Sequence, residues 1–166
     1  MHYSLDPVSV DEKEILRNLL EKYLYEFSQY DLCEVNALGL YGYGYLDNYW
    51  TEDNRWAYFI RMDGRLAGFA MVNDYMELRR DGQYNMAEFF VLHKYRRMGI
   101  GRQAALELFA RFPGRWELKY HPHNTASAAF WHSVVQEGAK SYTLHSKAEE
   151  FAYPDGTPGE IFFFDT

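Results

Sequence analysis

The stretch Arg96-Arg97-Met98-Gly99-Ile100-Gly101 joins two segments of different periodicity in the middle of the chain. The apolar run before it, residues 86–92, has the length and the aromatic and β-branched content of a buried strand. Glycine lets the backbone approach a ligand closely, and the free amides of a first helical turn attract anions. This basic strand–turn–helix unit therefore predicts a pyrophosphate-binding loop. The residues that recur at helical spacing after the loop are Ala105, Leu108, Phe109 and Phe112.

Two common glycine patterns of nucleotide-binding folds do not fit this loop. No Lys-Ser or Lys-Thr pair follows Gly101, and no third glycine stands three residues beyond it. A second strand–helix unit follows downstream: residues 116–120 read as a strand, Asn124 comes next, and residues 126–135 read as a helix. The chain thus contains two such units in succession.

The two units, in this order and spacing, resemble the GCN5-related N-acetyltransferase (GNAT) superfamily. The acyl-CoA signature of that family, Arg/Gln-x-x-Gly-x-Gly/Ala after an apolar strand, is matched by Arg96, Gly99 and Gly101. The second unit is similar to the family's strand–asparagine–helix segment. The resemblance implies that acetyl-CoA is the co-substrate.

The resemblance also implies which residues hold this co-substrate. The end of the strand would offer backbone groups to the pantetheine arm in the way that an added strand does. The loop amides would surround the pyrophosphate, and Asn124 would contact the pantetheine. Asn124 also suits a helix N-cap, and both roles can hold at once. The cofactor-binding residues expected on this basis are Phe90, Val91, Leu92, Arg96, Arg97, Met98, Gly99, Ile100, Gly101, Arg102 and Asn124.

The order of the expected elements predicts a mixed α/β fold. Ser9 and Glu12 form a capping box before an amphipathic helix that reaches Phe27. Residues 31–54 read as a loop, and the pair Asp63-Gly64 reads as a hairpin turn. Together with the resemblance, this order predicts a GNAT-like, mostly antiparallel twisted sheet flanked by helices, with the acyl-CoA cleft between the two motif strands. Strands are expected at 55–62, 66–72, 84–92, 116–120, 140–145 and 160–164.

Size and composition fit a single domain over residues 1–166. No run of about 18 apolar residues could span a membrane, and the N-terminus lacks the basic start and apolar middle of a signal peptide. The lone Cys33, which we expect in the core, excludes an internal disulfide and suits a reducing cytoplasm. The net charge of −7 argues against nucleic-acid binding. We therefore expect a cytoplasmic protein with no metal and no nucleic-acid or membrane partner. Whether the chain forms a homodimer is left open.

Acetyl transfer to an amine requires a base, because an alkylamine has a pKa of ~10 and is protonated at neutral pH. Glu88 lies on the strand that leads into the cofactor loop, and His121 and His123 flank Pro122 just after the second strand. Each candidate also has a structural interpretation. Strand faces alternate, so Glu88 can face solvent, and histidines beside a proline turn are common on surfaces.

One departure from the family concerns the proton donor to the leaving thiolate. Many members carry a tyrosine seven residues after the asparagine, and here that position is Trp131, whose indole N–H donates a hydrogen bond but is not a usable acid. Either Tyr142, Ser127 or water serves as the acid, or the thiolate leaves unassisted. A thiol pKa of ~8.5 makes the second route tolerable.

The acceptor side is expected in the glycine- and tyrosine-rich stretch, residues 39–50. Tyr41, Tyr43 and Tyr45 would attract a cationic amine through their ring faces, or would only cover the core. Two functions remain open. One is an N-acetyltransferase that transfers acetyl from acetyl-CoA to a primary amine of a small molecule, peptide or protein. The other is an acyl-CoA-binding regulatory or sensor module without turnover.

Overall fold

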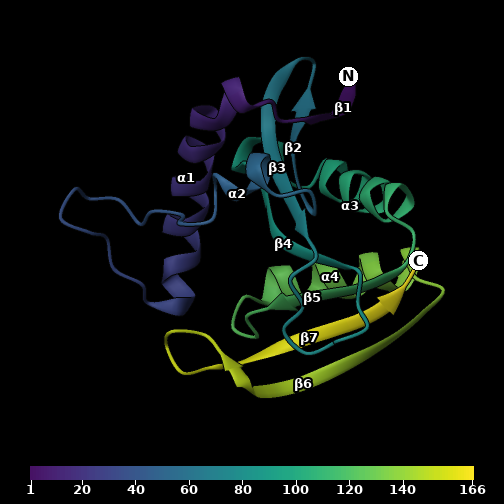
Figure 1. Ribbon diagram of the computed structural model, residues 1–166. Helices are drawn as coiled ribbons and strands as arrows, with labels where there is room; N and C mark the ends of the chain where they lie inside the picture. Colours follow the sequence, from purple (N-terminus) through teal and green to yellow (C-terminus); the bar gives the residue numbers. More distant parts are fainter.

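The computed structural model describes all residues from Met1 to Thr166 and contains one seven-stranded sheet in the order β1-β2-β3-β4-β5-β7-β6 (Figure 1). All neighbouring strands are antiparallel except β4 and β5, which are parallel. The expected mixed, mostly antiparallel sheet is confirmed. The strands are β1 (Tyr3–Pro7), β2 (Arg55–Met62), β3 (Arg65–Asn73), β4 (Tyr84–Val91), β5 (Arg115–Tyr120), β6 (Ser141–Ala152) and β7 (Pro158–Asp165).

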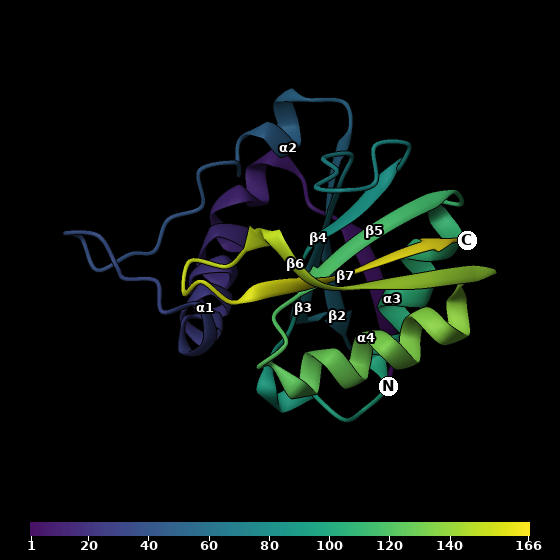
Figure 2. The ribbon, with the colours of Figure 1, turned by 90° about the horizontal axis from the view of Figure 1, so that it is seen from below.

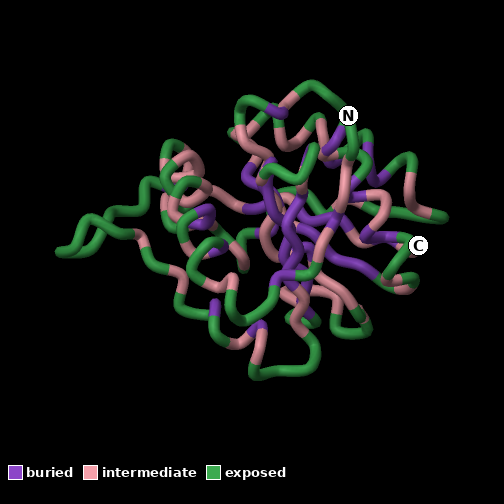
Figure 3. The backbone as a smooth tube through the Cα atoms, turned by 90° about the horizontal axis from the view of Figure 1, so that it is seen from above, coloured by how far each residue is buried: buried purple, intermediate pink, exposed green.

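Helices cover both faces of this sheet (Figure 2). The helices are α1 (Lys13–Asp31), α2 (Asn48–Thr51), α3 (Ile100–Arg111) and α4 (Thr125–Gly138). One apolar cluster joins α3 and α4 to the sheet, and a smaller cluster joins α1 and α2 to the opposite face. The buried strands run through the interior, whereas the segment between α1 and α2 projects as an exposed arm (Figure 3). No helix is long and apolar enough to cross a membrane.

The parallel strands β4 and β5 are paired over a short length only, and the gap beyond this pairing is where the candidate site lies. Only Tyr84 with Trp116 and Asn85 with Glu117 are paired, so the two strands diverge beyond Asn85. The edge of β4 that faces β5 therefore has no strand partner from Met86 to Val91. Backbone N–H and C=O groups on such an edge are free to bind an extended ligand.

Most of the predictions made from short sequence motifs are confirmed. The Ser9–Glu12 capping box is present, and the turn residues Asp63 and Gly64 have φ values of 50° and 75°. The strand β1 and the short helix α2 were not predicted, because both depend on contacts with β2 that no local pattern reports. Strand β6 also continues to Ala152, beyond the expected end at residue 145. The expectation that Cys33 is buried was wrong: it is exposed, just after the end of α1.

Candidate active site

The loop between β4 and α3 presents unpaired backbone amides. Arg97 and Gly99 adopt positive φ values of 63° and 81°, which turn the chain sharply into α3. The amides of Gly99, Ile100, Gly101 and Arg102 donate no hydrogen bond within the protein, as expected for the first turn of a helix. Four free N–H groups at the positive end of a helix dipole form a binding site suited to an anion.

The three arginines of the loop, Arg96, Arg97 and Arg102, differ in their contacts. Arg96 donates from Nε to the Val91 carbonyl at 2.8 Å, and its two terminal nitrogens each lie 2.8 Å from the Glu26 carboxylate. The Arg96 side chain thus links the end of β4 to α1. Arg102 bonds to Glu137 of α4, with Nε at 2.8 Å from Oε2. Arg97 is exposed, as is its neighbour Met98.

A cavity of 320 Å³ lies between the divergent strands and extends to α1 and α4. Asn124 lines it, and its side-chain oxygen accepts the Ser127 amide at 3.1 Å, so the N-cap interpretation of this residue is confirmed. Ser127 and Trp131 line the same cavity, whereas Tyr142 is exposed on β6 and does not. At the end of β4, the Phe90 ring packs with the α1 cluster, and Val91 is paired with Gly68. Leu92 donates its amide to the Ala67 carbonyl at 2.8 Å.

Glu88 lines this cavity from β4. A bulge at Ala87 shifts the register there, since Met71 is paired with Glu88 but Val72 is paired with Met86. The Tyr43 hydroxyl donates to the Glu88 carboxylate at 3.3 Å. Burial raises the pKa of Glu88 to about 7, although hydrogen bonds from Tyr23 and Tyr43 oppose this shift. A carboxyl group with this pKa can accept a proton at neutral pH.

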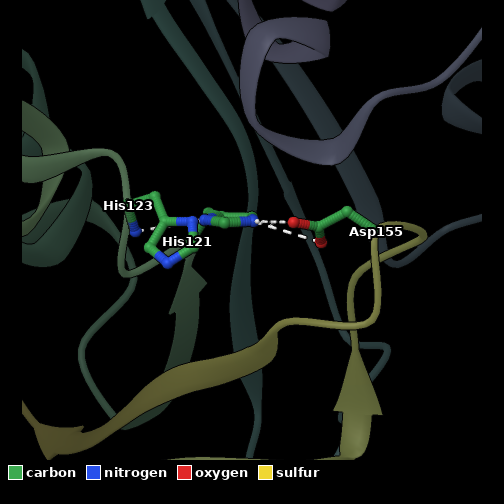
Figure 4. Close-up of side chains that lie close together, drawn as sticks. All are labelled: His121, His123 and Asp155. Carbon is green, nitrogen blue, oxygen red and sulfur yellow. Dashed lines mark hydrogen bonds and ion pairs between the residues drawn. The ribbon is translucent and has the colours of Figure 1, made fainter.

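His121 is fully buried at the end of β5, and both of its ring nitrogens have partners (Figure 4). The His123 amide donates to Nδ1 at 3.1 Å, and Nε2 lies 3.2 and 3.3 Å from the two Asp155 carboxylate oxygens. Because Nδ1 accepts, Nε2 carries the proton that it donates to Asp155. His121 therefore fastens the β6–β7 turn to β5. Side chains of His121, His123 and Asp155 also bring possible metal-ligating atoms within 4.8 Å of one another.

The carboxylate of Asp155 is held by more than this histidine. Thr157 donates to it from its hydroxyl at 2.7 Å and from its amide at 3.1 Å. The Thr157 hydroxyl, followed by smaller contributions that include His121, lowers the pKa of Asp155 below its ordinary value. The bonds of this carboxylate thus hold the β6–β7 turn, whose Tyr153 lines the cavity. The His123 side chain is exposed beside it.

The three tyrosines expected at the acceptor side differ in position. Tyr43 reaches Glu88 with its hydroxyl. The Tyr41 hydroxyl instead donates to Ser28 of α1 at 3.2 Å, and Tyr45 is 63% exposed. The stretch therefore brings one tyrosine to the Glu88 carboxylate, and none of the three tyrosines lines the cavity itself.

Several polar residues of the cavity were not anticipated from the sequence. They come from α1, from the β3–β4 loop, from β5 and from the β6–β7 turn. Tyr23 could have been found, because a tyrosine on an apolar helical face brings a hydroxyl into the interior. The others had no local signal. The unanticipated lining residues are Tyr23, Asp31, Glu77, Lys119 and Tyr153.

Comparison with known proteins gives a consistent result. Residues 16–134 match the Acetyltransferase (GNAT) family, and no curated protein matches the chain. An acetyltransferase from Thermus thermophilus is similar in structure, with a TM-score of 0.70, 14% identity, and coverage of 100% of this chain and 98% of the other. A chimeric spermidine N-acetyltransferase from Vibrio cholerae has a TM-score of 0.65 and 11% identity, covering 99% and 96%. A streptothricin acetyltransferase homologue from Bacillus anthracis, in complex with acetyl coenzyme A, has a TM-score of 0.54 and 13% identity, covering 72% and 67%.

Proposed function

The chain belongs to the Acetyltransferase (GNAT) family, and from this premise we propose that it transfers the acetyl group of acetyl-CoA to a primary amine. The observation that carries the proposal is the pair formed by a helix start with free amides, just after the unpaired edge of β4, and a carboxyl group of pKa about 7 on that same strand. The acetyl-CoA complex of the Bacillus anthracis neighbour supports the choice of co-substrate. The spermidine N-acetyltransferase neighbour supports an amine as acceptor.

In this proposal, the pyrophosphate binds the amides of residues 97–102, and the pantetheine lies along the free edge of β4 at Phe90, Val91 and Leu92. Asn124 contacts the pantetheine from the start of α4 while it caps that helix. Arg96 acts mainly by fixing the end of β4 to Glu26, since its guanidinium is fully engaged there. Arg97 and Arg102 add positive charge beside the loop.

The chemistry is a direct attack. Glu88, in its ionised form, takes a proton from the ammonium group of the acceptor, directly or through one water. The neutral nitrogen then attacks the thioester carbonyl, the C–S bond breaks, and CoA leaves as the thiolate. The second proton of the nitrogen passes to solvent or to the thiolate, whose ordinary pKa of ~8.5 lets it leave without a strong acid. His121 has no free ring nitrogen for this transfer, so it serves as a positioning residue.

The competing function is an acyl-CoA-binding sensor that does not turn over, which Trp131 at the usual tyrosine position permits. Measurements of binding and of turnover distinguish the enzyme from the sensor. Calorimetry with acetyl-CoA measures binding, and a thiol reagent measures CoA released in the presence of a panel of amines. The enzyme gives binding and amine-dependent thiol release. Binding without release over the whole panel establishes the sensor, and no binding refutes both.

A further inference from the structure

Trp131 on α4 is buried, with 7% of its surface exposed, yet its indole Nε1–H has no hydrogen-bond partner in the chain. Trp50 and Trp116 donate from the same atom to the carbonyls of Val8 and Phe112, at 3.0 and 2.9 Å. A buried tryptophan usually finds an acceptor for this N–H in this way. The free donor of Trp131 therefore calls for an acceptor from outside the chain.

The indole nitrogen can be reached from the cavity. Glu77 Oε2 is the only fully enclosed side-chain nitrogen or oxygen atom that lacks a partner, so Trp131 Nε1 keeps accessible surface. Trp131 lines the cavity that Glu88 also lines. The rings of Phe89 and Phe130 pack edge-to-face with the indole, with centroids 5.1 and 4.7 Å away. A ligand in the cavity thus meets an indole that its neighbours hold in place.

The contact between Trp131 and Phe89 brings the donor to the reacting part of the co-substrate. Phe89 lies on the unpaired edge of β4, between Glu88 and the residues 90–92 along which the pantetheine is proposed to lie. A pantetheine arm that follows this edge away from the loop reaches Phe89 next. Its sulfur therefore comes to the stretch of β4 that Trp131 contacts.

We propose, on the basis of the transferase function above, that Trp131 Nε1–H donates a hydrogen bond to the sulfur of CoA as the thiolate leaves. The amine nitrogen bonds to the acetyl carbon, the C–S bond breaks, and its electron pair stays on the sulfur. The indole keeps its proton, since it is a donor and not an acid at this pH. A hydrogen bond strengthens when its acceptor becomes ionised, so this contact favours the transition state over the bound thioester. Trp131 is then a catalytic residue.

The test measures what the sulfur contributes to binding. Calorimetry compares CoA with desulfo-CoA at about pH 9, where most of a thiol with a pKa of ~8.5 is ionised. Trp131→Phe should lower the ratio of the two affinities, CoA over desulfo-CoA, by about tenfold, because a hydrogen bond to an ionised group is lost. At about pH 6.5 the ratio should change much less, since neutral sulfur is a weak acceptor. The kcat for acetyl transfer should also fall by about tenfold, while the acidic limb set by Glu88 stays in place.

Two substitutions serve as controls. Ser127→Ala removes a hydroxyl that lines the same cavity one helical turn before Trp131, and it should leave the ratio unchanged. Trp56→Phe removes an indole on β2, outside the cavity, and should change neither the ratio nor kcat. If Trp131→Phe does not fold, the benzothiophene analogue of tryptophan at position 131 keeps the shape of the ring and removes only the N–H.

Each outcome decides the inference. An unchanged ratio at about pH 9, including equal losses of affinity for CoA and desulfo-CoA, overturns the contact with sulfur and leaves the transferase intact. A ratio that falls in Ser127→Ala and not in Trp131→Phe assigns the contact to the serine and also overturns the inference. If the ratio falls in Trp131→Phe but the wild-type protein releases no thiol with any amine, the transferase is refuted and the contact stands. Absence of CoA binding overturns both.

Discussion

Met86 and Glu88 are two residues apart on β4, yet they face opposite sides of the sheet. Met86 packs in the cluster under α3 and α4, whereas Glu88 accepts a hydrogen bond from Tyr43 on the α1 side. Regular strand alternation would place both on one face, and the bulge at Ala87 separates them. The bulge thus turns the acidic side chain of Glu88 toward the α1 side of the sheet and keeps the apolar side chain of Met86 in the core.

Removal of the Glu88 carboxylate tests its role as base. Glu88→Gln keeps the shape of the side chain but cannot accept the proton, so we expect kcat to fall by ~10² to 10⁴. The affinity for acetyl-CoA, measured by calorimetry, should stay unchanged. Glu149→Gln, at an exposed position on β6, should retain full activity. Normal kcat in Glu88→Gln would make this residue structural.

The pH dependence of the rate should follow Glu88. Its pKa of about 7 places the acidic limb of the kcat/KM profile near neutral pH, with activity rising as the carboxyl group loses its proton. The Tyr43 hydroxyl stabilises the ionised form, so Tyr43→Phe should raise this pKa and move the limb to higher pH. Tyr41→Phe removes a hydroxyl that bonds to Ser28 and should leave the profile in place. An equal shift of the acidic limb in Tyr43→Phe and Tyr41→Phe would contradict the role of Glu88.

Gly99 and Gly64 have similar positive φ values, so a valine substitution at each position distinguishes an effect on CoA binding from an effect on folding. Gly99 and Gly64 have φ values of 81° and 75°, and a Cβ at either meets no atom within 4 Å. Valine at each position should therefore destabilise the fold by a similar amount. Only Gly99→Val should weaken CoA binding strongly, by about tenfold or more, because the added bulk blocks the loop amides. Equal CoA affinity in the two variants, measured by calorimetry, would place the pyrophosphate elsewhere.

The cluster of His121, His123 and Asp155 should work without a metal, because hydrogen bonds already occupy both nitrogens of His121. Dialysis against a chelator should leave turnover and the melting temperature unchanged, and added Zn²⁺ should not raise the melting temperature. A Zn²⁺-dependent rise that disappears in His123→Ala would show that these residues bind a cation instead.

The sequence predicts the parts of the site that are local. The loop from Arg96 to Gly101 and the cap at Asn124 each depend on a few adjacent residues, and the helices and strands around them follow from periodicity. The face of Glu88 could not be predicted, since a bulge of one residue reverses it. The pairing of His121 with Asp155 spans 34 positions, and the placement of Glu77 depends on a buried carboxylate 40 positions away. Such contacts leave no periodic signal.

The most direct test of the central proposal follows both products of one reaction. The protein is incubated with acetyl-CoA and the best amine of the panel, free thiol is counted with a thiol reagent, and the N-acetylated amine is counted by mass spectrometry. We predict equal amounts of thiol and N-acetyl product, both dependent on the amine and both strongly reduced in Glu88→Gln. Thiol released without any N-acetyl product, or no thiol released at all, would contradict the account.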